Sequence, residues 1–269
     1  MIKIIDLDAL FDSYISDYVY KNVGKVKPEE IENNIPVLYT KFGDEKLKEL
    51  DGFTPNTFYK QFSAEELLNA LREHLETDVS VSDFLCEAII SNPQSSVAIS
   101  KLLSQENGEE FTLYLLNMLS DLDGELPTSR LLEMVLYDES EPIREVATSL
   151  LGGASEQVKD QILSVFNDSL DYVKADLIDI ISNCKNDERV FNLLVSEFKK
   201  HTENVPLYAS YLSKYGDDRA LPYLLEAIEN PKISYPDFEE LRFAIESLGG
   251  EYTKQRDFSN DKYYKKLKG

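Results

Sequence analysis

Two histidines are the side chains of this sequence best suited to metal binding or acid–base chemistry. His74 lies within residues 72–76 (Arg-Glu-His-Leu-Glu), and His201 follows Lys199 and Lys200. A zinc site on a helix often uses a second His or Cys about one turn away, and neither histidine has one at that spacing. A cation such as His201 is also favoured at the negative end of a helix. We therefore interpret both histidines as surface helix residues and predict no metal site and no cofactor.

Two cysteines are the next candidates. Cys86 and Cys184 are 98 positions apart in apolar helical stretches, and neither has a second Cys or a His at ligand spacing. This pattern favours free buried thiols in a reducing compartment. The N-terminus carries acids where a signal peptide needs an apolar run, and no stretch approaches about 18 apolar residues. We therefore expect a cytoplasmic protein that does not bind a membrane.

Carboxylates are abundant, and several are paired. Asp176 and Asp179, Glu239 and Glu240, or residues 109–110 could act as catalytic dyads, but solvated helix faces are the interpretation that we favour. The sequence contains no glycine-rich phosphate loop, no Gly-x-Ser-x-Gly motif and no Cys/His nucleophile pair, so we predict that it is not an enzyme. The acids become candidate partner-binding residues instead. The candidates on the polar side of these helices are Glu145, Ser149, Asp176, Asp179, Glu239 and Glu240.

A tyrosine stripe adds three further candidates. Tyr208, Tyr211 and Tyr215 recur at spacings of three and four, so they share one face of a helix. Such a stripe is more often part of a core than a ligand cage. If one of the rings faces solvent beside the acids, it forms a candidate hot spot for a binding partner.

A period of roughly 30 residues indicates how the chain arranges these side chains. Residues 187–194 match residues 217–224 at an offset of 30, both beginning Asp-acid-Arg. Intervening helical segments close at positions spaced 31, 33 and 33 apart: Gly152, Asn183, Gly216 and Gly249. A fixed period of this size is typical of a helical hairpin stacked on copies of itself.

Helical periodicity and turn residues predict an all-α chain. After a helical N-terminal region (1–78), in which Ser63 and Glu66 form a capping box, short links force consecutive helices to lie antiparallel. The expected extents are 81–91, 94–106, 109–121, 126–137, 141–152, 155–167, 170–183, 187–200, 205–215, 218–229 and 236–248. The sequence therefore predicts a helical N-terminal region (1–78), an α-solenoid (79–250) and a basic C-terminal tail (251–269).

Apolar residues of the second helix of each pair define the expected core face. A single hairpin cannot bury this face, whereas neighbours stacked on both sides can. The expected core residues are Ile143, Val146, Ala147, Leu150, Leu151, Val173, Leu177, Ile180, Ile181, Leu207, Tyr211, Leu212, Leu241, Ala244, Ile245 and Leu248.

The repeats resemble HEAT-like repeats, in particular the short bacterial type named after phycobilisome lyases. Residues 217–225 carry Asp-x-Arg-Ala followed by Pro and a Leu pair, and residues 143–152 carry Ile-Arg-x-x-Ala ending in Leu-Leu-Gly. The resemblance covers roughly residues 81–250. It implies a curved scaffold that binds macromolecules, although a minority of the family are enzymes. Two enzyme types do not fit, because iron-binding members need a His-Glu pair and DNA glycosylases need a basic groove.

Charge completes the functional prediction. The net charge is −22, and because six basic and three acidic residues give the tail +3, the other 250 residues carry −25. Such a body repels nucleic acid. We expect a noncatalytic scaffold that binds a protein or basic peptide. The alternatives are a lyase-like enzyme or prosthetic-group chaperone, and an acidic mimic of nucleic acid. The tail either docks on the chain or stays mobile, and four apolar residues favour docking: Phe258, Tyr263, Tyr264 and Leu267.

Overall fold

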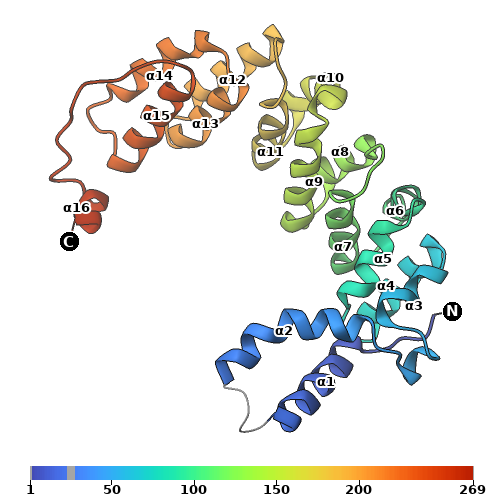
Figure 1. Ribbon diagram of the computed structural model, residues 1–269. Coiled ribbons are helices and arrows are strands. Elements are labelled where there is room, and N and C mark those ends of the chain that lie inside the picture. The colour runs from blue at the N-terminus through green and yellow to red at the C-terminus, as the bar shows by residue number, and fades with distance from the viewer. Residues whose placement is uncertain (1, 23–27, 269) are drawn as a thin grey trace. The chain divides into compact units, whose positions relative to one another are not determined.

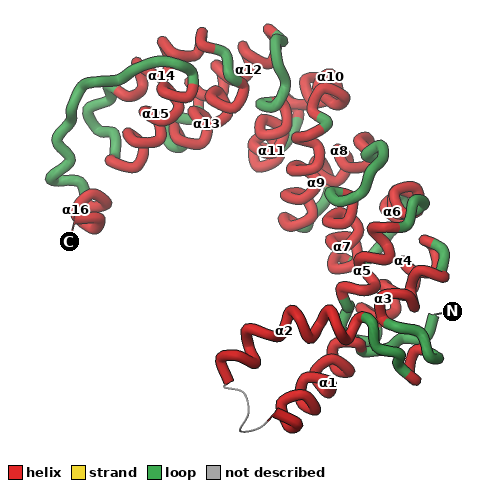
Figure 2. Tube along the Cα trace, in the orientation of Figure 1, coloured by secondary structure: helices red, strands yellow, loops and turns green. Residues whose placement is uncertain are grey.

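Helices form throughout the part of the chain that the computed structural model describes, residues 2–22 and 28–268. Within these ranges there is no strand, which confirms the all-α prediction (Figure 2). Local signals explain where the helices begin. Ser63 Oγ accepts a hydrogen bond from Glu66 N at 3.3 Å, and the Glu66 carboxylate accepts one from Ser63 N at 2.9 Å. This reciprocal pair is the predicted capping box.

Two compact units divide the chain, Met1–Pro127 and Thr128–Gly269. The described part of the first unit contains the following helices (Figure 1): α1 (Leu7–Asn22), α2 (Pro28–Gly43), α3 (Pro55–Phe58), α4 (Ala64–Glu76), α5 (Asp83–Ser91), α6 (Ser95–Leu103) and α7 (Glu109–Leu119), with short 3-10 turns at Lys48–Leu50 and Tyr59–Gln61.

The first unit is built around α4. This helix packs against α5, α6 and α7, and its buried face carries Leu67, Leu68 and Leu71. The sequence placed the end of the N-terminal region at residue 78, but α4 and the helices after that residue share one core. The boundary between the two units therefore lies later in the sequence than residue 78. The reason is that helices following α4 cover its apolar face.

The second unit carries the 30-residue period. Its described helices are α8 (Thr128–Tyr137), α9 (Glu141–Gly153), α10 (Ser155–Val165), α11 (Asp171–Ile181), α12 (Glu188–Lys200), α13 (Val205–Tyr215), α14 (Leu221–Ile228), α15 (Tyr235–Ser247) and α16 (Lys262–Lys268), with 3-10 turns at Phe166–Asp168 and Asp218–Ala220.

Second helices pack on one another within the first two pairs and within the last two, whereas α11 and α13 are not closely packed. α8 packs on α9 and α12 on α13, while α9 packs on α11 and α13 on α15. Most of the expected core face is buried, including Leu177, Leu241 and Ile245, each with 0% exposure. Val146, Leu150 and Leu207 were expected in the same core but remain half-buried. They lie at the edge of the face, where the neighbouring helix covers only part of the side chain.

Three of the four predicted closing residues lie at helix ends, and Gly152 does not. Gly216 and Gly249 have φ values of +81° and +79°, the left-handed conformation that suits glycine at a helix end. Asn183 ends α11 through its side chain, whose Nδ2 donates to the carbonyls of Asp179 and Ile180 at 2.9 and 3.0 Å. Gly152 lies inside α9, where a Cβ atom would come within 3.2 Å of Asn183 Nδ2. Its small size therefore allows α9 to approach the end of α11.

The basic tail docks on α14 and α15. The guanidinium of Arg256 donates to the carbonyls of Asn230 and Glu229 at 2.7 and 3.2 Å. Phe258 is 9% exposed, with its ring centre 5.0 Å from that of Phe238. Tyr264 packs at 4.9 Å against the ring of Tyr235. Two of the four residues expected to dock are not covered: Tyr263 and Leu267 are 45% and 73% exposed.

Candidate functional site

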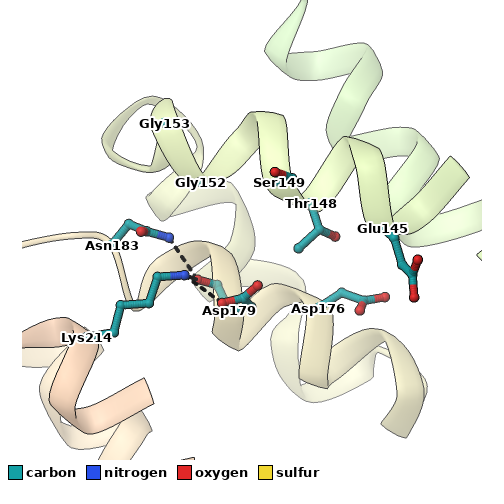
Figure 3. Close-up of a pocket in the computed structure, with 9 residues that line it drawn as sticks. All are labelled: Glu145, Thr148, Ser149, Gly152, Gly153, Asp176, Asp179, Asn183 and Lys214. Carbon is teal, nitrogen blue, oxygen red and sulfur yellow. Dashed lines mark hydrogen bonds and ion pairs between the residues drawn. The ribbon is translucent and has the colours of Figure 1, made fainter. Parts of the chain in front are cut away.

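A polar pocket of about 460 Å³ lies between α9, α11 and α13 in the second unit (Figure 3). Four of the residues that the sequence proposed for partner binding line it: Glu145, Ser149, Asp176 and Asp179. The other lining residues are Thr148, Gly152, Gly153, Asn183 and Lys214. The structure thus brings together candidates that lie up to 34 positions apart in the sequence.

Helix geometry explains why these side chains converge. Glu145 and Ser149 are four residues apart on α9, and Asp176 and Asp179 are three residues apart on α11, so each pair lies on one helix face. Because α9 packs directly on α11, the two polar faces border the same hollow. The pocket is therefore a product of the packing between second helices of neighbouring repeats.

Lys214 supplies a positive charge at one end of the pocket. Its Nζ lies 2.7 Å from Asp179 Oδ1 and 3.4 Å from the carbonyl oxygen of Asp179. Figure 3 shows the ammonium reaching from α13 to the end of α11, beside Asn183. Three carboxylates and one ammonium make up the charged groups of the described lining. Asp179 is paired with Lys214, and Asp176 lies within 3.7 Å of Arg144, a cation outside the lining. Glu145 therefore leaves the pocket with an excess of negative charge.

Asp176 is the least exposed carboxylate of the pocket. Its side chain is 27% exposed, and its Oδ2 lies 3.7 Å from Arg144 Nε, too far for a hydrogen bond. Burial raises the pKa of Asp176. The Arg144 charge acts in the opposite direction, and the nearby carboxylates of Asp179 and Glu145 raise this pKa further. The negative charge at this position is therefore incompletely compensated within the protein.

Thr148 is a lining residue that the sequence analysis missed. The residue is 6% exposed, and its Oγ1 is buried without a hydrogen-bond partner among the described residues. In Figure 3 its side chain points from α9 toward the α11 side of the pocket. Thr148 follows Ala147, a residue of the expected core face, and the polar candidates were chosen on the other side of the helix. The sequence signal that could have identified Thr148 is its hydroxyl group next to an apolar helix face. Burying a hydroxyl without a hydrogen-bond partner costs free energy.

The tyrosine stripe lies in the core and not on an exposed surface. Tyr208, Tyr211 and Tyr215 are 7%, 8% and 3% exposed, and burial raises the pKa of each. Tyr215 has a structural role, because its hydroxyl accepts from Asp187 N and donates to Asp187 O, both at 2.9 Å. The three rings therefore support the packing of α13 and do not form the solvent-facing hot spot that was considered.

The acids of α15 lie outside the pocket. Glu239 pairs with Arg242 at 2.9 Å, and Glu240 is exposed. Arg242 also approaches Glu246 at 3.6 Å, so its positive charge is shared along α15. Glu239 and Glu240 are thus separate from Glu145 and the α11 acids.

The histidines and cysteines do not converge on a metal site. Within residues 2–22 and 28–268, no group of three or more His, Cys, Asp or Glu side chains has the arrangement to hold an ion. His74 was expected on the surface, but it is 1% exposed and its Nδ1 lies 2.8 Å from the Ser80 carbonyl oxygen. The following turn folds back over it, a tertiary contact that helical periodicity does not reveal. Cys86 and Cys184 are free; Cys184 is buried as expected, whereas Cys86 was expected to be buried and is half-buried.

The described helices include none with the length and apolarity required to cross a bilayer. Comparison with protein-family models, with curated proteins and with solved structures finds no match to this chain.

Proposed function

We propose that this protein is a noncatalytic interaction scaffold that binds a basic protein segment at the acidic pocket between α9 and α11. The main observation in support is that Glu145, Asp176 and Asp179 converge around one hollow. The described lining of this hollow contains a single ammonium group. Carboxylates that lack enough cations of their own attract those of a partner. The net charge of −22 speeds the approach of a basic partner through the same electrostatic attraction.

We further propose that the second unit is an α-solenoid of HEAT-like hairpins. A repeated polar contact supports this architecture. Arg189 binds Asp187 two residues before it and reaches Asp160 on the preceding first helix at 2.8 Å. One period later Arg219 does the same, binding Asp217 and reaching Glu188 at 3.0 Å. Equivalent contacts at successive first helices are expected of stacked copies of one unit. The free thiols support a reducing, cytoplasmic location.

The chemistry of the pocket favours a polar partner over a prosthetic group. Pockets for small organic cofactors are lined mainly by hydrophobic and aromatic side chains. The described lining here consists of carboxylates, hydroxyls, an amide, an ammonium and two glycines. These groups match a hydrated, positively charged segment of polypeptide.

The proposal is tested by fluorescence anisotropy with a labelled, unstructured peptide that contains alternating Lys and Arg. We expect binding that weakens as salt is raised, because exposed charges are screened over about 10 Å at 0.1 M. The double variant Glu145→Gln/Asp176→Asn should weaken binding by about tenfold or more. The matched control is Glu239→Gln/Glu240→Gln, which removes the same charge from α15. Equal losses in the two double variants, or no salt-sensitive binding by the wild type, would contradict the proposal.

A further inference from the structure

Three large apolar side chains are exposed near one another in the second unit. Tyr137 at the end of α8 is 77% exposed, and Leu170 and Tyr172 at the start of α11 are 61% and 54% exposed. Arg144 of α9 connects these positions. Its Nη1 donates to the two backbone carbonyls that directly follow Tyr137, at 3.0 and 3.1 Å, and its guanidinium carbon lies 4.9 Å from the centre of the Tyr172 ring. We call Tyr137, Leu170 and Tyr172 the tyrosine patch.

The composition of the tyrosine patch is typical of a binding surface. Single exposed apolar residues are common on proteins, whereas grouped ones mark places where another molecule binds. Tyrosine is also among the residue types on which the energy of an interface concentrates, because its ring buries a large area and its hydroxyl tolerates water.

Acidic side chains surround the tyrosine patch. The exposed acids next to it in the chain are Glu139, Glu141, Asp168 and Asp171. Asp171 shares its charge with Lys174 at 3.4 Å, but the other three carboxylates have no ion pair among the described residues. We call these four acids the rim. An apolar centre with a negative rim is complementary to a segment whose apolar residues are flanked by cations.

Helix α16 of this chain is such a segment. Its Tyr263 and Leu267 are four residues apart and therefore share one face, and they are 45% and 73% exposed. Lys262, Lys265 and Lys266 are also exposed, and none of them forms an ion pair within the described part of the chain. The outward face of α16 thus carries apolar residues that are not covered and positive charge that is not compensated.

The docked tail holds α16 away from the tyrosine patch of its own chain. Arg256 donates to the backbone carbonyls of Glu229 and Asn230 after α14, and the rings of Phe258 and Tyr264 pack on α15. Helices α12 and α13 lie between α15 and α11 in the second unit (Figure 1). The outward face of α16 is therefore available to a second molecule.

We propose that copies of this chain associate head to tail, with Tyr263 and Leu267 of one copy packed on the tyrosine patch of a second copy and the α16 lysines facing its rim. Because the two surfaces differ, each pair keeps one free patch and one free tail, so the contact can propagate. A seven-residue helix makes a small contact, and interfaces below about 1,200 Å² are typical of transient association. This inference goes beyond the proposed function and uses no residue that lines the acidic pocket.

Analytical ultracentrifugation of the full chain tests the inference. We expect the average mass of the wild type to rise above that of one chain between about 10 µM and 1 mM, the range of weak contacts. Tyr137→Ser/Leu170→Ser disables the patch, and Tyr263→Ser/Leu267→Ser disables α16. Each double variant should weaken association by about tenfold or more. A wild type that stays monomeric would overturn the inference and assign the patch to a different partner, while leaving the proposed function standing.

A mixture of the two disabled variants distinguishes a head-to-tail contact from other modes. The intact α16 of the patch variant meets the intact patch of the tail variant, so the mixture should form pairs of chains and nothing longer. The matched control is Tyr20→Ser/Val97→Ser, which removes the same kinds of side chain from α1 and α6, where they are 83% and 69% exposed. Circular dichroism verifies that each variant is folded. A mixture that stays monomeric, or an equal loss of association in the control, would overturn the proposed contact.

Charge reversal tests the role of the rim. Lys265→Glu/Lys266→Glu and Glu139→Lys/Glu141→Lys should each associate at least about tenfold more weakly than the wild type, because like charges then face each other. Mixing these two variants brings opposite charges together again and should restore association. A mixture no more associated than its separate components would contradict the assigned rim.

Discussion

Lys214 of α13 and Asp179 of α11 form an ion pair that links successive second helices, with Nζ 2.7 Å from Oδ1. The two side chains are 40% and 41% exposed, so the pair contributes at most about 1 kcal/mol to stability. Its larger effect is on the charge of the pocket. By neutralising Asp179, Lys214 confines the available negative charge to the opposite end, where Glu145 and Asp176 lie.

Replacing Lys214 should therefore strengthen binding of a basic peptide. Lys214→Met removes the pocket ammonium and releases the Asp179 carboxylate, and we expect the dissociation constant to fall by about threefold to tenfold at low salt. The control is Lys232→Met, which makes the same change of charge on an exposed turn after α14. Anisotropy titrations of both variants provide the measurement. Weaker binding by Lys214→Met than by Lys232→Met would show that the ammonium assists the ligand.

Asp176→Asn should stabilise the second unit at neutral pH. Burial, the largest influence on this group, raises the pKa of Asp176 in the folded protein above its unfolded value. Its ionised form is therefore disfavoured by folding, and the penalty applies above the folded pKa. The penalty disappears as the pH falls through that pKa toward the unfolded value. We expect Tm to rise by about 1–2 °C at pH 7, and the rise to vanish near pH 3. A lower Tm at pH 7 would mean that the Arg144 charge outweighs burial.

Asp187→Asn should have the opposite dependence on pH. Hydrogen bonds from the Arg189 side chain hold the pKa of Asp187 well below its usual range, with further contributions from Arg189 N and Lys159. This carboxylate contributes stability above its unfolded pKa, and the contribution is lost as the pH falls through the folded value. Because Arg189 is exposed and the pair is screened by solvent, we expect a loss of about 0.5–1 kcal/mol at pH 7.

The difference between Asp187→Asn and the wild type should narrow as the pH falls below 4, because the wild-type carboxyl then takes up a proton. Urea unfolding followed by circular dichroism between pH 7 and pH 2 measures this difference. Asp168→Asn, at an exposed acid after α10, is the control and should change stability by less than about 0.5 kcal/mol at each pH. A difference that stays constant with pH would show that charge is not the cause.

The parts of this fold that could be predicted from the sequence are those set by local signals within one helix. α13 begins and ends at the expected residues, 205 and 215, because Pro206 suits a first turn and Gly216 suits a left-handed end. The pairs Glu145/Ser149 and Asp176/Asp179 were predictable for a similar reason. Their spacing within one helix places each pair on a common polar face.

The remaining parts of the site depend on contacts between helices. Lys214 reaches the pocket from another helix, and the hydroxyl of Thr148 is buried without a partner among the described residues. The prediction that His74 lies on the surface was wrong because the chain at Ser80 folds over this side chain. Periodicity reports the face on which a side chain lies, but it does not report the element that will cover this face.

Phe258→Ala should release the basic tail from α14 and α15. Phe258 is 9% exposed and packs against Phe238 and Tyr235, at 5.0 and 5.3 Å between ring centres. Truncating such a ring costs about 3–5 kcal/mol in a full core, which exceeds what the exposed tail contacts can supply. Hydrogen exchange should then speed up in residues 254–268. Tyr263→Ala, at a 45% exposed ring, is the control. Protection that persists in Phe258→Ala would show that Arg256 and Lys254 hold the tail.

Leu177→Asp should unfold the second unit, because it places a carboxylate at a fully buried position of α11. Leu177 is 0% exposed, and burial of an unpaired charge costs more than the roughly 5–15 kcal/mol that stabilises a typical domain. The milder Leu177→Ala should reduce the free energy of unfolding by about 2–5 kcal/mol. Leu170→Ala, at a 61% exposed position just before α11, is the matched control and should change it by less than about 0.5 kcal/mol. The melting temperatures of the three variants provide the measurement. A wild-type Tm in Leu177→Asp would refute the assigned core face of the repeats.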